Sequence, residues 1–125
     1  MPPLFYDIIY GMLNRKYRFH SRGGVRYTYQ HGKTIRKPDI NLVHAINERK
    51  KERYAVVVSK KVAKSAVERN RIRRRVYEAI RLTKSEQNFS AAKDNIFIVY
   101  SKKPLTMPFE KLRDLVSSLL KESMV

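Results

Sequence analysis

The chain has 125 residues, which is enough for one domain with a single modest hydrophobic core and too short for two. It carries 28 Lys and Arg against 11 Asp and Glu, a formal net charge of +17, so we expect a polyanionic partner, and nucleic acid fits this better than a membrane. The absence of cysteine excludes disulfides, cysteine-ligated zinc and cysteine nucleophiles, and His20, His31 and His44 lack the spacing of metal ligands.

The first residues, MPPLFYDIIYGML, are apolar but do not resemble a secretion signal, because they lack a basic start and a small-residue cleavage site and contain Asp7. No stretch reaches the roughly 18 consecutive apolar residues that indicate a membrane-spanning helix, so we expect a cytoplasmic location. We expect residues 1–14 to be an N-terminal extension and residues 15–125 to be one RNA-binding domain. Two alternatives stay open for the extension: it is disordered, or Met12 is the true first residue and residues 1–11 are not translated.

Residues 15–37 combine eight basic residues with no acidic one, and four aromatic rings are interleaved with them: Tyr17, Phe19, Tyr27 and Tyr29. Such a mixture is typical of grooves for single-stranded nucleic acid, where bases stack on the rings and cations follow the phosphates. The alternative is that the rings are core residues. Val25 and Tyr29 fit a short helix that Gly32 ends, whereas Gly23 and Gly24 weaken or delay its start.

Two apolar segments follow this helix. In residues 39–47, Ile40, Leu42 and Ile46 alternate with polar or smaller residues, which indicates a strand with one buried face. Residues 54–59 form a nearly continuous apolar run, which predicts a central strand covered on both faces. Because only a short polar turn separates the two strands, we expect them to be antiparallel neighbours.

Residues 66–82 contain neither proline nor glycine and predict a helix. Four apolar residues fall within about 100° of one another around this helix and form its expected core face: Ile72, Val76, Ala79 and Ile80. The opposite ridge, which we expect to face solvent or a partner, consists of Asn70, Arg74, Tyr77 and Arg81, flanked by Arg71 and Arg73.

The region from Lys60 to Lys84 holds ten basic residues against only Glu68 and Glu78. Crowding of like charges destabilises a helix, so we expect an anion to offset it. Arginine binds phosphate oxygens with two parallel hydrogen bonds and also stacks on bases. The pattern therefore favours a nucleic-acid surface over the alternative of a charged face that is merely solvated.

The C-terminal part predicts a loop over residues 83–95, a strand at residues 96–100 and a last helix. This helix should start near residues 106–108, with Thr106 or Met107 at the cap and Pro108 in the first turn. Its apolar residues keep helical spacing to the end: Phe109, Leu112, Leu115, Val116, Leu119 and Leu120. The order helix, strand, strand, helix, strand, helix predicts a two-layer α+β sandwich.

One ordered combination of motifs resembles the signature of the bacterial ribonuclease P protein component. It consists of Val58-Ser59-Lys60-Lys61, seven intervening residues, and Arg69-Asn70-Arg71-Ile72-Arg73-Arg74, with Glu78 and Arg81 beyond. The likeness covers about residues 17–121. The chain departs from the family pattern in having no glycine in the loop before Arg69, Tyr77 where a basic residue is common, and Val25 where an aromatic ring is usual.

The resemblance implies a fold and a function. The fold would be an α+β two-layer sandwich with a small mixed sheet and the order αβββαβα, which includes one more short strand. Its βαβ crossover would be left-handed, although the general rule predicts a right-handed one. The function would be that of a protein subunit of ribonuclease P, the endonuclease that removes the 5′ leader of precursor tRNA.

The resemblance also implies the partners and their sites. The catalytic RNA would hold the Mg²⁺ ions and would dock on Lys60, Lys61, Lys64, Arg69, Asn70, Arg71, Arg73, Arg74 and Arg81. The 5′ leader of precursor tRNA would lie in a cleft that includes Phe19, Val25, Tyr29 and Val43. No catalytic residue, metal or cofactor is expected on the protein, which should be a monomer within the ribonucleoprotein.

Two other functions stay open on the sequence. The first is a structural RNA-binding protein, such as a ribosomal or RNA-chaperone module, and composition alone does not separate it from a ribonuclease P subunit. The second is a reader of duplex DNA that places the arginine-rich helix in a major groove. Such a reader would normally bring a helix-turn-helix partner or a dimer interface, and the sequence shows neither.

Overall fold

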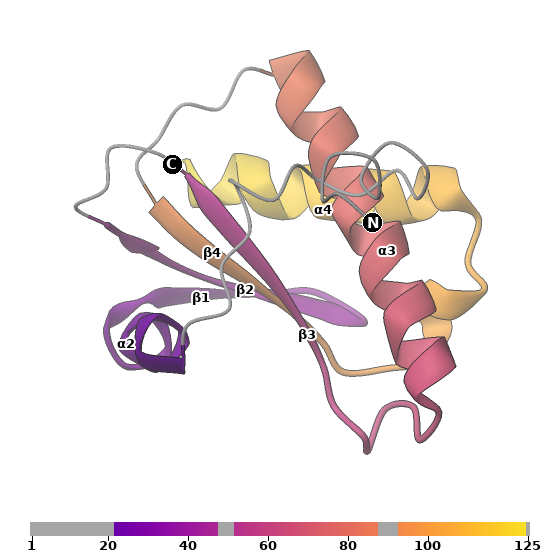
Figure 1. Cartoon of the computed structure of the whole chain (residues 1–125). Coiled ribbons are helices and arrows are strands. Elements are labelled where there is room, and N and C mark those ends of the chain that lie inside the picture. Colours follow the sequence, from indigo (N-terminus) through magenta and orange to yellow (C-terminus); the bar gives the residue numbers. More distant parts are fainter. Residues whose placement is uncertain (1–21, 48–51, 88–92, 125) are drawn as a thin grey trace, which may run out of the picture.

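The computed structural model describes residues 22–47, 52–87 and 93–124. In chain order the elements are α2 (Arg22–His31), β1 (Lys33–Arg36), β2 (Ile40–Ile46), β3 (Arg53–Val58), α3 (Ala66–Gln87), β4 (Lys93–Val99), the 3-10 turn η2 (Lys103–Leu105) and α4 (Phe109–Ser123). Figure 1 labels these α-helices and strands. This αβββαβα order confirms the expected α+β fold. The proposed extension, residues 1–14, and Phe19 lie outside the described residues.

The four strands form one mixed sheet in the order β1-β2-β4-β3. β1 pairs with β2 and β2 with β4 in antiparallel fashion, whereas β3 and β4 are parallel. The prediction that β2 and β3 are neighbours is wrong, because β4 lies between them. The prediction that residues 54–59 form a central strand is also wrong, since β3 lies at the edge. The prediction that both faces of this strand are covered is confirmed, because its alternate residues belong to two apolar clusters.

α3 is the crossover between the parallel strands β3 and β4. A parallel pair needs such a long connection, and here the arginine-rich helix provides it. The left-handed course of this crossover stays a prediction.

The sheet separates two unequal layers. α3 and α4 pack together on one face, and α2 lies against the other face over β2 and β4 (Figure 1). Even-numbered residues of β2, such as Ile40 and Leu42, join the main core under α3 and α4. The smaller cluster on the α2 face consists of Val43, Ala55 and Ile96, with Val57 and Ile98 packed against it and only half-buried.

The core face of α3 is confirmed, because Ile72, Val76, Ala79 and Ile80 are fully buried. Tyr77, which we expected on the exposed ridge, is only 3% exposed and belongs to the main core. The buried sector of α3 is wider than the apolar pattern indicates, since α4 and η2 pack against the helix in addition to the sheet.

Two boundaries between α3 and β4 differ from the prediction. α3 continues to Gln87 rather than ending at Leu82, and Lys84 in this extra turn forms an ion pair with Glu52 at 2.7 Å. β4 begins at Lys93 rather than Ile96. At both places polar residues form specific tertiary contacts. Hydrophobic periodicity does not register such residues and therefore predicts a loop there.

α4 follows the predicted apolar spacing, with Leu112, Val116, Leu119 and Leu120 buried. Its cap differs from the prediction, because Pro108 is itself the N-cap residue and neither Thr106 nor Met107 takes that position. The preceding residues form η2, in which Leu105 and Thr106 donate backbone hydrogen bonds to Lys102 and Lys103.

Gly32 ends α2 as predicted and lies where two backbone segments approach each other closely. Its N–H donates to the carbonyl oxygen of Thr28 at 2.7 Å. A Cβ at this position would lie 2.5 Å from that oxygen, 2.7 Å from the carbonyl oxygen of His44 and 3.0 Å from Cγ1 of Val43. A hydrogen atom is therefore needed at this junction between α2 and the sheet.

We expect Gly32→Ala to lower the free energy of unfolding by about 1–3 kcal/mol, because two of the three clashing atoms are backbone atoms that cannot turn away. Urea unfolding followed by circular dichroism measures the change. Gln30→Ala, at an exposed position on the same helix, is the control and should change stability little. An unchanged midpoint for Gly32→Ala would show that α2 is not held closely to β2.

Candidate nucleic-acid interface

The loop between β3 and α3 is folded tightly enough to present its lysines outward. The Ser59 carbonyl accepts hydrogen bonds from Val62 at 3.1 Å and Ala63 at 3.3 Å, and the Ala63 side chain is buried. Lys60 and Lys61 lie between these anchors and are exposed, as is Lys64. The missing glycine therefore does not prevent a compact turn.

The first turn of α3 is capped by Ser65, whose Oγ accepts a hydrogen bond from the Glu68 N–H at 3.4 Å. Serine at the cap and glutamate three residues later form a common helix-start pattern. Glu68 in turn pairs with Lys102 of the loop after β4 at 3.2 Å. The only acidic residue of this turn is thus neutralised by a neighbouring segment.

Arg69 and Arg75 bind the protein itself. The Nη1 of Arg69 donates to the carbonyl oxygens of Ala63 at 2.9 Å and Lys64 at 2.8 Å, which fixes the loop to the helix. Arg75 donates to the carbonyl oxygens of Pro104 at 2.5 Å and Met107 at 2.6 Å and so fixes η2. Arg69, predicted as a direct RNA contact, therefore already positions the lysine-bearing loop.

The remaining predicted residues of α3 differ in how they are held. Asn70 accepts a hydrogen bond from Arg73 at 2.6 Å. Arg81 pairs with Glu78 at 2.5 Å, and this hydrogen bond raises the pKa of Arg81 above its ordinary value. Arg71 is exposed and, like Lys60, Lys61 and Lys64, has no side-chain hydrogen bond or ion pair within the described residues.

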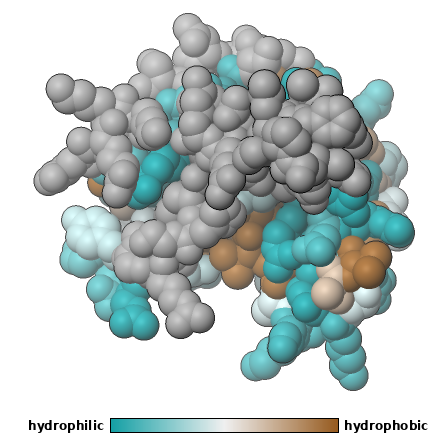
Figure 2. All heavy atoms as spheres, in the orientation of Figure 1, coloured by the Kyte–Doolittle hydropathy of each residue, from teal (hydrophilic) through white to brown (hydrophobic). Residues whose placement is uncertain are grey.

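We call the surface formed by Lys60, Lys61, Lys64, Asn70, Arg71 and Arg73 the α3 surface; all of these residues are exposed except Arg73, which is half-buried. Its cations come from one loop and the first half of one helix. Figure 2 shows how much of the visible described surface of the molecule is hydrophilic, with hydrophobic residues confined to small patches. A cluster of unpaired cations is electrostatically unfavourable alone and becomes favourable when it binds phosphates.

The α2 face of the sheet gathers the second group of predicted residues. Tyr29 on α2 is 44% exposed, and partial burial raises the pKa of its phenol. Val43 is buried beneath Gly32, so it supports the cleft rather than offering a surface for a base. Val25 lies on α2, but its side chain is not among the described ones, and Phe19 lies outside the described residues.

Three residues of this face were not singled out from the sequence. Val57 and Ile98 are paired in register and half-buried beside the buried Val43 cluster. Asn41 on the neighbouring strand β2 is also in register with Ile98, and its Oδ1 is buried without a hydrogen-bond partner in the described structure. A buried acceptor that stays unsatisfied in this way costs about 1–3 kcal/mol. The alternation of side chains along Tyr54–Val58 is the signal in the sequence that could have shown which residues of β3 lie on each face of the sheet.

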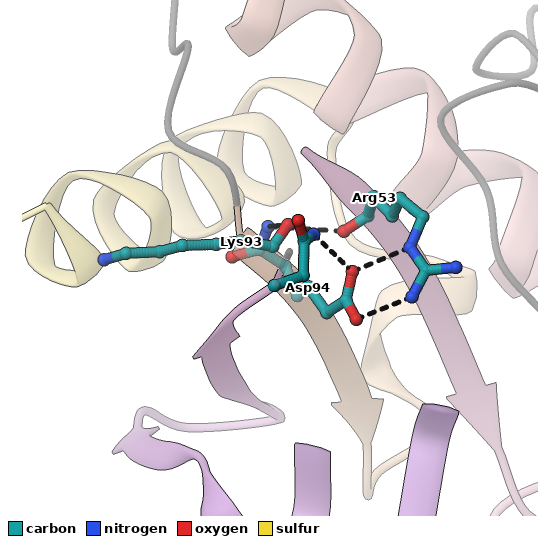
Figure 3. Close-up of polar contacts among 5 residues, drawn as sticks. Arg53, Lys93 and Asp94 are labelled. Carbon is teal, nitrogen blue, oxygen red and sulfur yellow. Dashed lines mark hydrogen bonds and ion pairs between the residues drawn. The ribbon is translucent and has the colours of Figure 1, made fainter. Parts of the chain in front are cut away.

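An ion pair closes the end of the same face. Arg53 on β3 donates from Nε and Nη2 to the two carboxylate oxygens of Asp94 on β4 at 2.8 and 2.7 Å (Figure 3). Asn47, after β2, also donates to Asp94 at 2.8 Å. The three strands are thus joined, and the carboxylate is neutralised so that it repels a polyanion less.

Comparisons with known proteins identify the family of this chain. The sequence model of the family described as Ribonuclease P matches residues 13–124. The chain belongs to the ribonuclease P protein family. Ribonuclease P protein components from two strains of Chloroflexus aurantiacus are each 34% identical over 111 residues, covering 89% of this chain and 80% of theirs.

Solved ribonuclease P proteins share the fold. A Staphylococcus aureus RNase P protein mutant with defective mRNA degradation activity has a TM-score of 0.74 at 23% identity, covering 100% of this chain and 99% of its own. The Thermotoga maritima RNase P protein in complex with 1-(4-fluorophenyl)-2-thiourea has a TM-score of 0.72 at 23% identity, covering 83% and 97%. Membership of the ribonuclease P family connects the chain with an endoribonuclease complex, a ribonucleoprotein of tRNA processing.

Neither a membrane span nor a metal site was found in the described parts of this ribonuclease P family member. No helix there is long and apolar enough to cross a membrane. The same residues contain no group of three or more His, Asp or Glu side chains that could hold a metal ion.

Proposed function

We propose that this chain is the protein subunit that binds the catalytic RNA of ribonuclease P through the α3 surface. The observation that carries the proposal is that Lys60, Lys61, Lys64 and Arg71 extend from one rigid segment and have no partners within the described residues. Arg69 holds the loop in place, so the lysines are arranged before RNA arrives. Such preorganisation lowers the entropy lost on binding.

We further propose that the 5′ leader of precursor tRNA lies on the α2 face of the sheet. Tyr29 provides a ring for base stacking, and Val57 and Ile98 provide an apolar floor. Arg53 neutralises Asp94 at one end, which favours a negatively charged strand. The protein would then contact the RNA subunit and the substrate on different faces.

Under this proposal the metal ions of the reaction are held by RNA phosphates. The described residues do not form a set of carboxylates that fits a two-metal site, in which the ions are about 4 Å apart. The role of the protein is then to reduce repulsion between two RNA molecules and to hold the leader. Reconstitution tests this role, because the RNA should need less Mg²⁺ when the protein is added.

Tyr29→Ala is expected to weaken binding of precursor tRNA by roughly tenfold and to leave binding of mature tRNA unchanged, because only the precursor has a leader base to stack. Affinities of both tRNAs for the reconstituted enzyme measure this. Tyr29→Phe keeps the ring and is the control, which should bind as the unmodified chain does. Equal losses for the two substrates would mean that Tyr29 has a structural role only.

A further inference from the structure

A cavity of about 520 Å³ lies away from the α3 surface, where the end of α2 meets the sheet and the end of α4. Its lining comes from five elements and includes the aromatic and charged or titratable residues Tyr27, His31, Lys33, His44, Lys93 and Glu122. The volume falls within the range of about 300–1,000 Å³ that is typical of small-molecule sites.

The pocket reaches the sheet face opposite the proposed leader cleft, although Tyr27 and His31 in its lining belong to α2 on the cleft side. His44 is the register partner of Lys33 on β1 and comes two residues after Leu42, which is in the main core under α3 and α4. Side chains two residues apart on a strand share a face. The pocket therefore differs from the Val43 and Val57 cluster in including side chains of the opposite face, whereas Thr34, Ala45 and α2 lie on the side that the two share.

An aromatic platform forms one wall of the pocket. The rings of Tyr27 and His31 are stacked, with centroids 4.2 Å apart and planes inclined by 21°. The Nδ1 of His31 contacts the Tyr27 carbonyl oxygen at 3.1 Å, and because a carbonyl only accepts, this nitrogen carries the proton. Tyr27 remains 54% exposed, so a free aromatic surface is available for a planar ligand.

Two cations provide positive charge beside this platform. Lys93 extends toward α4 (Figure 3) and donates to the Ser123 carbonyl oxygen at 2.6 Å, which leaves other N–H groups of its ammonium for a ligand. Lys33 is exposed and has no side-chain partner within the described residues. The carboxylate of Glu122 is paired with Lys37 at 2.8 Å, so the lining favours an anion.

His44 supplies a polar group at the base of the pocket. It is 8% exposed, and burial, together with the positive charges of Lys93 and Lys33, lowers its pKa below the ordinary value. At neutral pH the imidazole is therefore uncharged and offers one donor and one acceptor. It has no hydrogen bond to any described residue, and a buried polar group normally has one.

We propose that this pocket binds a nucleotide. The base stacks on the pair Tyr27 and His31, the phosphate is bound by Lys33 and Lys93, and His44 forms a hydrogen bond with the ribose or the base edge. A free nucleoside monophosphate and an unpaired nucleotide of an RNA chain share this chemistry. The residues of this site are not among those assigned to the α3 surface or to the leader cleft.

Calorimetric titration of the full chain with AMP tests the site, with a Kd of roughly 1 mM or tighter expected. Adenosine and inorganic phosphate, each tested alone, should bind about tenfold more weakly than AMP, because each lacks one half of the interaction. Tyr27→Leu and Lys33→Ala should each weaken AMP binding about tenfold. Binding of AMP that these two substitutions leave unchanged would overturn the proposal, as would absence of saturation at about 10 mM AMP.

Two control substitutions match the test. Lys111→Ala removes an exposed lysine of α4 that does not line the pocket, and Arg71→Ala removes a charge from the α3 surface. Both variants should bind AMP as the unmodified chain does. If either control lost as much AMP affinity as Lys33→Ala, the loss would be explained by the change in net charge, and the proposed site would be contradicted. Competition by a four-nucleotide single-stranded RNA distinguishes the sources: displacement of AMP indicates an RNA nucleotide, and no displacement indicates a free nucleotide.

Discussion

Arg71→Ala is expected to weaken binding of the catalytic RNA about tenfold and to lower the slope of log affinity against log salt by about one unit. The guanidinium is exposed and unpaired within the described structure, so its loss removes a phosphate contact and leaves the fold intact. Filter binding of the RNA at several salt concentrations gives both quantities.

Arg69→Ala should lower the affinity for the catalytic RNA at least as much as Arg71→Ala does, for a different reason. Arg69 holds the carbonyls of Ala63 and Lys64, so its loss loosens the loop that carries Lys60 and Lys61 as well as removing a charge. Lys111→Ala, at an exposed position in the first turn of α4, is the matched control and should change neither affinity nor slope beyond error. Equal RNA affinity and slope in Arg71→Ala and the unmodified chain would show that the α3 surface does not face RNA.

RNA-free protein is expected to show no cleavage of precursor tRNA at any Mg²⁺ concentration, which is the largest effect the account predicts. Glu68 and Glu78 are ten residues apart on one helix, about 15 Å, too far for ions about 4 Å apart. Each is also paired, Glu68 with Lys102 and Glu78 with Arg81. The RNA subunit alone should cleave at high Mg²⁺ and need less when the protein is present.

Glu68→Gln and Glu78→Gln are the controls for this experiment. Both variants should support cleavage by the reconstituted enzyme, since neither carboxylate is assigned to the chemistry. Leader removal by protein that has been freed of RNA, abolished by either substitution, would instead indicate a protein nuclease.

The sequence predicted the elements of this fold better than their arrangement. Apolar periodicity correctly identified the core faces of α3 and α4. Helical spacing places apolar residues such as Ile72, Val76 and Leu112 on one face of each helix, and these residues are buried. The position of β4 between β2 and β3 could not be predicted from apolar periodicity, since the pairing of these strands depends on the α3 crossover. Lys93 and Asp94 were assigned to a loop because their tertiary ion pair and hydrogen bonds leave no periodic signal.

The candidate site was predictable as a set of charges and only partly as a set of contacts. Like-charge crowding indicated a surface for an anion, but not that Arg69 and Arg75 would bind backbone carbonyls. Tyr77 was placed on the wrong side because a tyrosine at the edge of an apolar sector packs equally well against a neighbouring helix. The stacked pair of Tyr27 and His31 was visible only as an i, i+4 spacing.

Purification of the tagged chain from its host, followed by sequencing of the RNA that remains bound, tests whether this chain binds the RNA of ribonuclease P. We expect the RNA subunit of ribonuclease P to be the most enriched species, and we expect Arg71→Ala to reduce its recovery while Lys111→Ala does not. Recovery of ribosomal RNA in its place, with no enrichment of the ribonuclease P RNA, would show that the chain is a different RNA-binding protein.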